Sequence, residues 1–243
     1  MITILVNGAN GRMGTEAVQL VENTPDFHLV ASGTEEHDLS QLIKEHRPDI
    51  VIDFTTAQVA YHNAKIIIEH NTRPVIGTSG FLPEQISELT QLCATKKLGG
   101  VIAPNFSIAV VLLQRCAQQI AAYLPHVEII EMHHDGKLDA PSATAIKTAE
   151  LLASVREKTP IKVCHETIPH ARGALCHDIP IHAIRLPGVV AHLQTIFGNT
   201  GETLRLQHDS INRESFMPGV ALACRKVMEL NQLIYGLETL IGH

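Results

Sequence analysis

The sequence Gly8-Ala9-Asn10-Gly11-Arg12-Met13-Gly14 follows an apolar run at Ile2–Gly8 and opens a helical pattern at Arg12–Glu22. Glycines at such a junction let the backbone turn tightly and approach a pyrophosphate, whose charge the helix N-terminus stabilises. The GxxGxxG spacing differs from the usual GxGxxG. The prediction of a dinucleotide-binding turn therefore depends on the position of this sequence, between the first strand and the first helix. The alternative is a glycine-rich turn without a ligand. We predict that the following residues bind a dinucleotide: Gly8, Ala9, Asn10, Gly11, Arg12 and Met13.

Strands alternate with helices through the first part of the chain. Strand-like runs occur at Phe27–Gly33, Asp49–Thr55, Pro74–Thr78 and Gly100–Ala103, and helical patterns at Leu39–His46, Ala57–His70 and Pro83–Lys97. The buried runs do not alternate in polarity, as expected for a parallel sheet that is covered on both faces. The sequence therefore predicts the α/β class, with a Rossmann-type doubly wound parallel sheet.

The pattern changes after Phe106. Helical patterns at Ser107–Leu124 and Ala143–Val155 flank a strand at Val127–Glu131, and β-type runs follow at Ile179–Leu186, Val189–Phe197 and Glu202–His208. The last two runs are joined by the turn signal Gly198-Asn199-Thr200-Gly201. We expect a second α+β domain with a mixed or antiparallel sheet over residues 107–213. A helix at Glu214–Leu233 is expected to return to the first domain, which comprises residues 1–106 and 214–243.

Composition limits the classes of protein that the chain can belong to. Hydrophobic residues make up 45% and charged residues 18% of the 243 residues, and no apolar run is long enough for a membrane helix. The net charge of −6 argues against a nucleic-acid partner. Five cysteines without a CxxC pair, and an N-terminus that reads as a strand rather than a signal peptide, favour a cytoplasmic protein.

Further cofactor contacts are expected at the carboxyl ends of the predicted strands, where open α/β sheets bind ligands. Glu35 lies about 20 residues beyond Gly14, where an acidic residue meets the adenosine ribose, and this would favour NADH. Arg12 could instead meet a 2′-phosphate and permit NADPH, and a solvated turn is an equally good account of Glu35. The remaining candidates are small residues and their neighbours: Gly77, Thr78, Ser79, Ala103, Pro104, Asn105 and Phe106.

The segment Glu131–Ala145 carries the reactive side chains. Two imidazoles, His133 and His134, and the ammonium of Lys137 precede a Pro-Ser turn that opens a helix. Backbone amides at such a helix start can bind a carboxylate, and lysine or histidine can supply a proton. The segment therefore suits an anionic substrate that is both reduced and protonated. A polar loop capped by Ser142 or Asp139 would explain the same residues without a ligand.

Together these segments resemble the 4-hydroxy-tetrahydrodipicolinate reductase family, also called dihydrodipicolinate reductase. The resemblance runs essentially from end to end, and the spacing Glu-x-His-His-x-x-Lys-x-Asp-x-Pro-Ser is its most specific part. It is carried by these segments: Gly8–Gly14, Asp53-Phe54-Thr55, Gly77–Phe81, Ala103–Ala109, Glu131–Ala145 and Arg213–Val220.

The resemblance implies a homotetrameric enzyme that reduces an unsaturated cyclic dicarboxylate with NADPH or NADH, in the diaminopimelate route to lysine. It gives His133 and Lys137 the catalytic roles, with Lys137 as proton donor and His133 as the proton-handling histidine. Either residue could deliver the proton. The substrate carboxylates would be bound by His134, Ser142, Ala143 and Thr144.

Two positions depart from the family pattern. The usual Ser-Gly-Thr is Ser142-Ala143-Thr144 here; alanine keeps the amide, so carboxylate binding should survive unless Ala143 needs a positive φ. Some members carry Glu-Arg where this chain has Thr34-Glu35, which leaves the choice between NADH and NADPH open.

Other classes of protein are less consistent with the sequence. Tyr61 and Lys65 match the YxxxK pair of short-chain dehydrogenases, but they lie too early in the chain and lack an upstream serine. No tight histidine spacing indicates a metal site, so we expect no metal. A non-catalytic dinucleotide sensor of the same fold is the remaining alternative, and such a protein would not need the His-His-x-x-Lys cluster.

Overall fold

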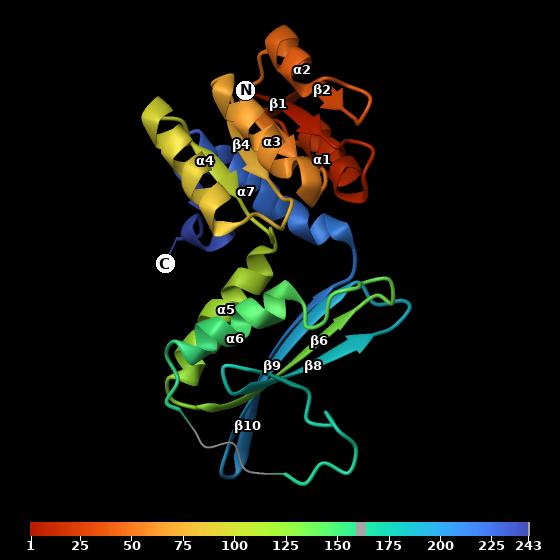
Figure 1. Cartoon of the computed structure of the whole chain (residues 1–243), viewed down its shortest axis with the longest axis vertical. Coiled ribbons are helices and arrows are strands. Elements are labelled where there is room, and N and C mark those ends of the chain that lie inside the picture. The colour runs from red at the N-terminus through yellow and green to blue at the C-terminus, as the bar shows by residue number, and fades with distance from the viewer. Residues whose placement is uncertain (159–163, 243) are drawn as a thin grey trace. The chain divides into compact units, whose positions relative to one another are not determined.

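The computed structural model describes residues 1–158 and 164–242 (Figure 1). The chain forms two compact units, residues 1–108 with 213–243 and residues 109–212, and each is described by itself. Among the described residues, no helix has the length and apolar character needed to cross a membrane.

The first unit is built on a six-stranded sheet in the order β11-β5-β4-β3-β1-β2, in which every pair is parallel. Its strands are β1 (Ile2–Asn7), β2 (Phe27–Gly33), β3 (Ile50–Asp53), β4 (Arg73–Ile76), β5 (Gly100–Ile102) and β11 (Leu233–Tyr235). Its helices are α1 (Arg12–Asn23), α2 (Leu39–His46), α3 (Ala57–Glu69), α4 (Pro83–Lys96) and α7 (Met217–Val227), with the 3₁₀ turns η1 (Arg213–Phe216) and η2 (Leu237–Thr239). The predicted doubly wound parallel sheet is confirmed.

Helices cover both faces of this sheet (Figure 1). Helices α2, α3 and α4 contact one another in succession, and α1 contacts α7. Neighbouring strand residues point to opposite faces, and Ile4 and Leu5 are both fully buried. This two-sided burial explains why the strand sequences are apolar without alternation.

The glycine-rich turn between β1 and α1 needs glycine at two positions for different reasons. Gly8 has a φ of +80°, a conformation that residues with a side chain rarely adopt. Gly14 lies where a Cβ atom would be 2.0 Å from the carbonyl oxygen of Gly8, so a side chain there would push α1 away from the turn. The predicted roles of glycine in turning and in close packing are therefore both present.

The predicted helix over Glu214–Leu233 is wrong in its last part. Helix α7 ends at Val227, and Leu233–Tyr235 form β11, the sixth strand, which pairs in parallel with β5. The amide of Gly100 donates to the carbonyl oxygen of Gln232 at 3.1 Å, so the pairing begins directly before β11. A three-residue strand is determined by the sheet edge that it completes, and local periodicity does not contain that information.

The second unit contains a five-stranded mixed sheet in the order β10-β9-β6-β8-β7. Its strands are β6 (His126–His133), β7 (Ala174–Cys176), β8 (Ile179–Arg185), β9 (Ala191–Asn199) and β10 (Glu202–Ser210). Only β6 and β8 pair in parallel, and the short strand β7 was not predicted. Thr200 and Gly201 form the two-residue connection between β9 and β10, where a turn was predicted.

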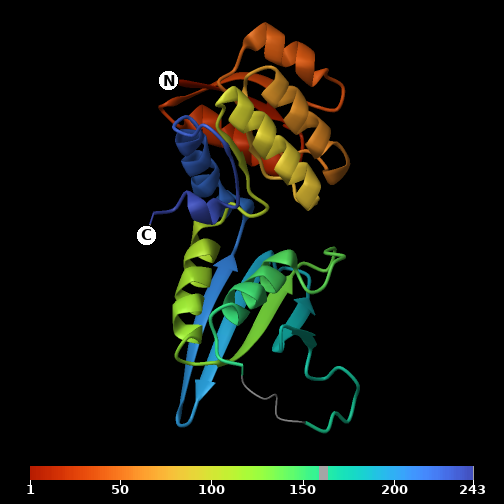
Figure 2. The same cartoon turned by 60° about the vertical axis from the view of Figure 1, so that its left-hand side comes forward.

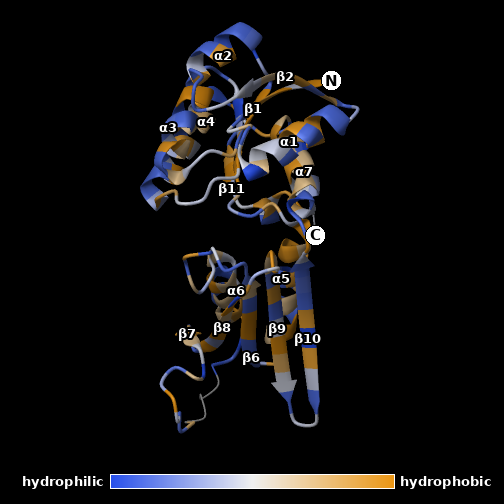
Figure 3. Ribbon diagram, turned by 90° about the vertical axis from the view of Figure 1, so that its right-hand side faces the viewer, coloured by the Kyte–Doolittle hydropathy of each residue, from blue (hydrophilic) through white to orange (hydrophobic). Residues whose placement is uncertain are grey.

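Two helices, α5 (Ile108–Ala121) and α6 (Ala143–Ala153), pack on one face of this sheet (Figure 2). Their apolar side chains form one core with the sheet residues Ile129, Ile181 and Phe197. Along β9, buried residues alternate with partly exposed ones, and the sheet carries both hydrophobic and hydrophilic residues (Figure 3). The packed helices thus fix which residues of β6, including Glu131, face the interior.

The close packing at Gly14 predicts that alanine destabilises the protein there, which is the opposite of its usual effect in a helix. Alanine normally stabilises a helix by about 1 kcal/mol relative to glycine, but here its Cβ would overlap the Gly8 carbonyl. We expect Gly14→Ala to lower the free energy of unfolding by about 1–3 kcal/mol, the usual cost of overpacking, in urea titrations. Gly198→Ala is the control, since a Cβ at Gly198 meets no atom within 4 Å. A more stable Gly14→Ala protein would contradict the assigned packing.

Candidate active site

The predicted cofactor segments of the first unit meet at the carboxyl edge of its sheet. The amide of Phe54 donates to the Asn7 carbonyl at 3.0 Å, and the amide of Gly77 donates to the Asp53 carbonyl at 3.0 Å. The amide of Ala103 continues this ladder by donating to the Ile76 carbonyl at 2.9 Å. The segments that follow β1, β3, β4 and β5 are therefore held side by side.

A buried carboxylate that was not among the predicted site residues organises this edge. Asp53 is fully buried at the end of β3. Its Oδ2 atom accepts hydrogen bonds from the side-chain amides of Asn7, at 2.8 Å, and Asn63, at 2.9 Å. Its Oδ1 atom accepts from the amide and the hydroxyl of Thr55, at 3.1 and 2.6 Å. Asp53 thereby ties the ends of β1 and β3 to α3.

The turn that opens α1 fits the phosphates of a dinucleotide. Gly11 is the N-cap residue, and no side chain caps the helix. The first-turn amides of a helix lack intrahelical partners and attract anions. The space that side chains at Gly8 and Gly14 would fill is occupied by backbone, so glycine lets α1 and the segment after β3 pack closely against the turn. Arg12 is exposed at the first position of α1.

The remaining predicted cofactor-binding residues differ in how exposed they are to solvent. Glu35 is exposed on a turn that Thr34 and His37 close, with the Thr34 hydroxyl 2.8 Å from the His37 Nδ1. Ala103 and Phe106 are buried, and the Phe106 ring packs edge-on against Phe54 with centroids 6.0 Å apart. Thr78 is also buried, and its hydroxyl donates to the Thr55 carbonyl at 3.3 Å. Gly77 and Asn105 are partly buried, whereas Ser79 and Pro104 are exposed.

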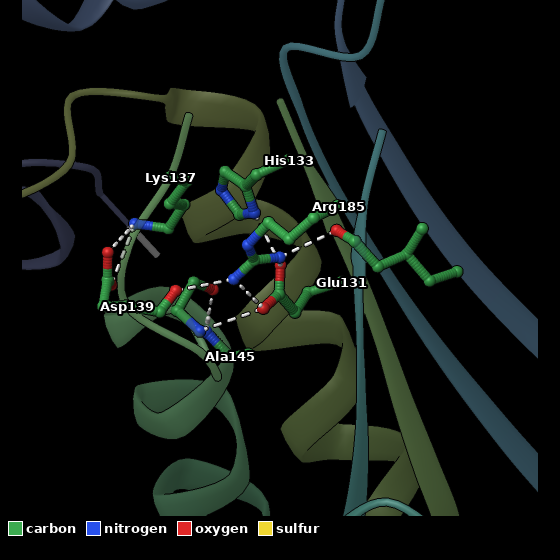
Figure 4. Close-up of polar contacts among 8 residues, drawn as sticks. Glu131, His133, Lys137, Asp139, Ala145 and Arg185 are labelled. Atoms are coloured by element: carbon green, nitrogen blue, oxygen red, sulfur yellow. Dashed lines mark hydrogen bonds and ion pairs between the residues drawn. The ribbon is translucent and has the colours of Figure 1, made fainter. Parts of the chain in front are cut away.

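In the second unit, strand β6 carries His133, one of the two predicted catalytic residues (Figure 4). His133 is the last residue of β6, and its Nδ1 lies 2.5 Å from Oε2 of Glu131, two residues earlier on the same face of the strand. Arg185, at the end of β8, pairs with His133 in the strand register and donates to both Glu131 carboxylate oxygens at 2.9 Å. The three side chains form one hydrogen-bonded cluster.

The pKa of Glu131 reflects this cluster. Burial alone would raise the pKa of this fully buried carboxyl group. The hydrogen bonds and charges of His133 and Arg185 outweigh burial and lower the pKa to about 2. Glu131 is therefore a carboxylate at neutral pH, and it can only accept hydrogen bonds.

Lys137 lies on the loop between β6 and α6, where its ammonium donates to both carboxylate oxygens of Asp139 at 2.7 and 2.9 Å (Figure 4). The Lys137 hydrogen bond lowers the pKa of Asp139. This pair is partly open to solvent, since the Asp139 side chain is 60% exposed.

The residues predicted to bind the substrate carboxylates include the first residues of α6. Ser142 is the N-cap residue, and its hydroxyl accepts from the amide of Ala145 at 3.2 Å. Ala143 is exposed and is the first helical residue, so it has ordinary helical backbone and alanine causes no strain there. Thr144 and His134 are partly buried. The structure thus brings Ser142, Ala143 and Thr144 together on one turn.

Three residues that shape these sites have no predicted role: Asp53 and Glu131, which lie in segments that carry the family resemblance, and Arg185, which lies in none of them. A charged residue that ends an apolar run, as Asp53 does after Ile50–Ile52, is a signal that could have been used. Arg185 has no such signal, because its partner Glu131 lies 54 residues away in the chain.

The chain has a Rossmann-type unit with a dinucleotide-binding turn. Its second unit presents an imidazole, an ammonium and a helix N-terminus. This combination is typical of a nicotinamide-dependent oxidoreductase. Residues 2–106 match the family described as "Dihydrodipicolinate reductase, N-terminus", and residues 109–241 match "Dihydrodipicolinate reductase, C-terminus". The chain belongs to the dihydrodipicolinate reductase family, and the resemblance seen in its sequence is confirmed.

Relatives and a solved structure agree with this assignment. The chain is 51% identical to 4-hydroxy-tetrahydrodipicolinate reductase of Legionella pneumophila (strain Philadelphia 1) over 239 residues, which cover 98% of each chain. It is 48% identical to the Coxiella burnetii (strain Dugway 5J108-111) protein of the same name, over 99% of each chain. The structure of dipicolinate-bound dihydrodipicolinate reductase from Paenisporosarcina sp. TG-14 superposes with a TM-score of 0.89 at 42% identity, covering 99% of this chain and all of that one.

The lowered pKa of Glu131 predicts a pH-dependent contribution to stability. The pKa falls from 4.5 to about 2 on folding, so the stabilisation is present above about pH 4.5 and is lost as the pH falls towards about 2. A shift of this size corresponds to about 3 kcal/mol. We expect the difference in free energy of unfolding between wild type and Glu131→Gln to narrow by about 2–3 kcal/mol between about pH 6 and pH 2.5. Urea titrations across this range measure it, and a difference that stays constant would contradict the pairing.

Proposed function

We propose that the chain is an NADPH- or NADH-dependent 4-hydroxy-tetrahydrodipicolinate reductase. It would reduce (2S,4S)-4-hydroxy-2,3,4,5-tetrahydrodipicolinate to tetrahydrodipicolinate, with loss of water, in the diaminopimelate route to lysine. The observation that carries the proposal is the arrangement of His133, Lys137 and the α6 N-terminus in a chain that belongs to this reductase family. The Paenisporosarcina relative is bound to dipicolinate, a small dicarboxylate, which supports a substrate of this kind.

In this proposal the first unit, with its functional limits at residues 1–106 and 214–243, holds the dinucleotide. The uncapped start of α1 receives the pyrophosphate between Gly8 and Met13, because first-turn amides and the helix dipole favour an anion. The segments Gly77–Ser79 and Ala103–Phe106, which lie on the same sheet edge, complete the site. Glu35 and Arg12, both exposed, are the candidates for meeting the adenosine ribose or its 2′-phosphate.

Residues 107–213 would bind the substrate. One carboxylate would accept hydrogen bonds from the amides of Ala143 and Thr144 and from the Ser142 turn, and His134 would hold the second. Two fixed anchors would orient the ring and determine which face is reduced.

The proton is supplied by the protein. When bound, the cofactor provides the hydride that reduces the unsaturated ring. Loss of the 4-hydroxyl group as water gives the ring a second double bond. Lys137 or His133 donates a proton to the charge that develops on this ring, so that hydride and proton together saturate one of the two double bonds. The Lys137 ammonium is held by Asp139, whose side chain is exposed to solvent.

We further propose that the enzyme acts as a homotetramer in the cytoplasm. Side chains of Ile130, Met132, Ile184 and Ile196 alternate with the core residues of their strands, so they lie on the sheet face opposite the core. An apolar sheet face of this kind is suited to contact between subunits. The five cysteines are free thiols, as expected in a reducing compartment.

Steady-state kinetics with NADPH and NADH, and with substrate generated by the preceding synthase, test the function. Cofactor oxidation that depends on the substrate is the expected result. Binding of the cofactor without oxidation in the presence of substrate would instead favour the dinucleotide-sensor alternative.

Replacement of Lys137 tests the proposed proton donor. We expect Lys137→Ala to lower kcat by about 100- to 10,000-fold, the usual range for loss of a general acid, while the melting temperature stays near that of wild type. Lys147→Ala is the matched control, because Lys147 is an exposed lysine on α6 that pairs with Glu150. Turnover at the wild-type level in Lys137→Ala would exclude Lys137 as the donor.

A further inference from the structure

We propose that Glu131, held by Arg185, is a positioning residue that orients His133 and the first turn of α6 at the same time. The proposal rests on the function proposed above, for which His133 and α6 form the substrate site. Glu131 would act only through these two neighbours, so it is distinct from the residues that touch the substrate.

Every hydrogen-bonding direction of the Glu131 carboxylate that the structure records leads to a functional element (Figure 4). Oε2 lies 2.5 Å from Nδ1 of His133 and accepts from Arg185 at 2.9 Å. Oε1 accepts from Arg185 at 2.9 Å and from the amide of Ser142 at 3.1 Å. The carboxylate is fully buried, so these protein groups take the place of water around it.

The contact with His133 fixes which ring nitrogen carries a proton. A carboxylate accepts hydrogen bonds and cannot donate, so Nδ1 of His133 is the donor in this pair. The proton at Nδ1 stays engaged, which leaves Nε2 as the nitrogen that can exchange a proton with a ligand. The His133 side chain is only 16% exposed, so its ring is held in this orientation by packing as well.

The contact with Ser142 fixes the start of α6. The Ser142 amide donates to Glu131, while its hydroxyl accepts from Ala145 within the helix. This N-cap residue is therefore held from both sides. Its position determines where the next two amides, those of Ala143 and Thr144, lie. One carboxylate thus relates the proton-exchanging nitrogen to the proposed carboxylate-binding turn.

Arg185 compensates the charge of the buried Glu131 carboxylate and links it to the loop that carries Lys137. Its guanidinium pairs with both carboxylate oxygens and also donates to the Asp139 carbonyl at 2.7 Å. The charged groups around the cluster are thus Arg185 from β8 and the pair of Lys137 and Asp139 from the loop. On β9, the register partners of Glu131 and His133 are Leu193 and Ala191, which carry no charge.

Strand β6 also contains a natural control for this cluster. Glu128 lies three residues earlier, on the opposite face of β6, and likewise pairs with a histidine, His182 at 2.8 Å, and an arginine, Arg172. Its side chain is 36% exposed, and its partners His182 and Arg172 are not among the proposed site residues. Glu128→Gln therefore removes a similar carboxylate without disturbing His133 or α6.

A double-mutant cycle on kcat tests the proposal, using wild type, Glu131→Gln, His133→Gln and the double variant. We expect Glu131→Gln to lower kcat by about 10- to 100-fold in the wild-type background, a range typical of groups that orient a functional histidine. In the His133→Gln background the same change should lower kcat by less than about 3-fold, because the route through His133 is gone and only the contact with the α6 turn remains. KM for the cofactor should stay within about 2-fold, and Glu128→Gln should retain wild-type kcat.

Two results would overturn the proposal: an unchanged kcat in Glu131→Gln, or an equal loss in both backgrounds, as a purely structural role would give. If Glu131→Gln does not fold, the combination of Glu131→Gln with Arg185→Met removes both buried charges. This combined variant then takes the place of Glu131→Gln in the cycle.

A second measurement is independent of catalysis. In ¹⁵N-histidine-labelled protein, the His133 signals, assigned by their loss in His133→Gln, should show a protonated Nδ1 in wild type and a changed tautomer in Glu131→Gln. Unchanged signals would reject the positioning role, even if the wild type proved inactive as a reductase. If the wild type is inactive but Glu131→Gln changes the His133 signals, only the proposed function is rejected.

Discussion

The second unit depends on the burial of one carboxylate, that of Glu131. A buried charge without partners costs several kcal/mol, so the surrounding chain must supply donors in fixed directions. Arg185, His133 and the Ser142 amide do so from β8, from β6 itself and from the start of α6. The satisfied carboxylate consequently fixes the relative positions of three elements on which the proposed chemistry depends.

The first unit uses the same physical device at its own sheet. Asp53 is fully buried at the carboxyl end of β3 and is satisfied by Asn7, Asn63 and Thr55. In both units, a carboxylate near the end of a strand holds loops that would otherwise be free to move. The difference is in the partners: neutral amides and a hydroxyl surround Asp53, whereas an arginine and a histidine surround Glu131. Only the second arrangement places a proton-exchanging group beside the carboxylate.

The sequence contained most of the fold because its elements follow local rules. The strand Phe27–Gly33 and the helix Leu39–His46 were predicted with the bounds that the structure has. The failures were of another kind. The strands Leu233–Tyr235 and Ala174–Cys176 have three residues each and exist because a sheet edge pairs with them. Periodicity within the segment cannot reveal such a partner.

The candidate site divides along the same line. The cluster His133, His134 and Lys137 and the turn at Ser142 lie within ten residues of one another, so their pattern was visible in the sequence. The pairing of Glu131 with Arg185 spans 54 residues, and the pairing of Asn7 with Asp53 spans 46. These contacts depend on strand order and register, which are properties of the folded sheet.

Isotope transfer tests most directly whether this chain moves a hydride from a nicotinamide to its dicarboxylate substrate. Stereospecifically 4-deuterated NADPH, or NADH if that is the better cofactor, is turned over with the synthase product, and tetrahydrodipicolinate is analysed by mass spectrometry. We expect the product from one of the two cofactor epimers to carry one deuterium on a ring carbon. A product without deuterium from either epimer, or no product at all, would contradict it.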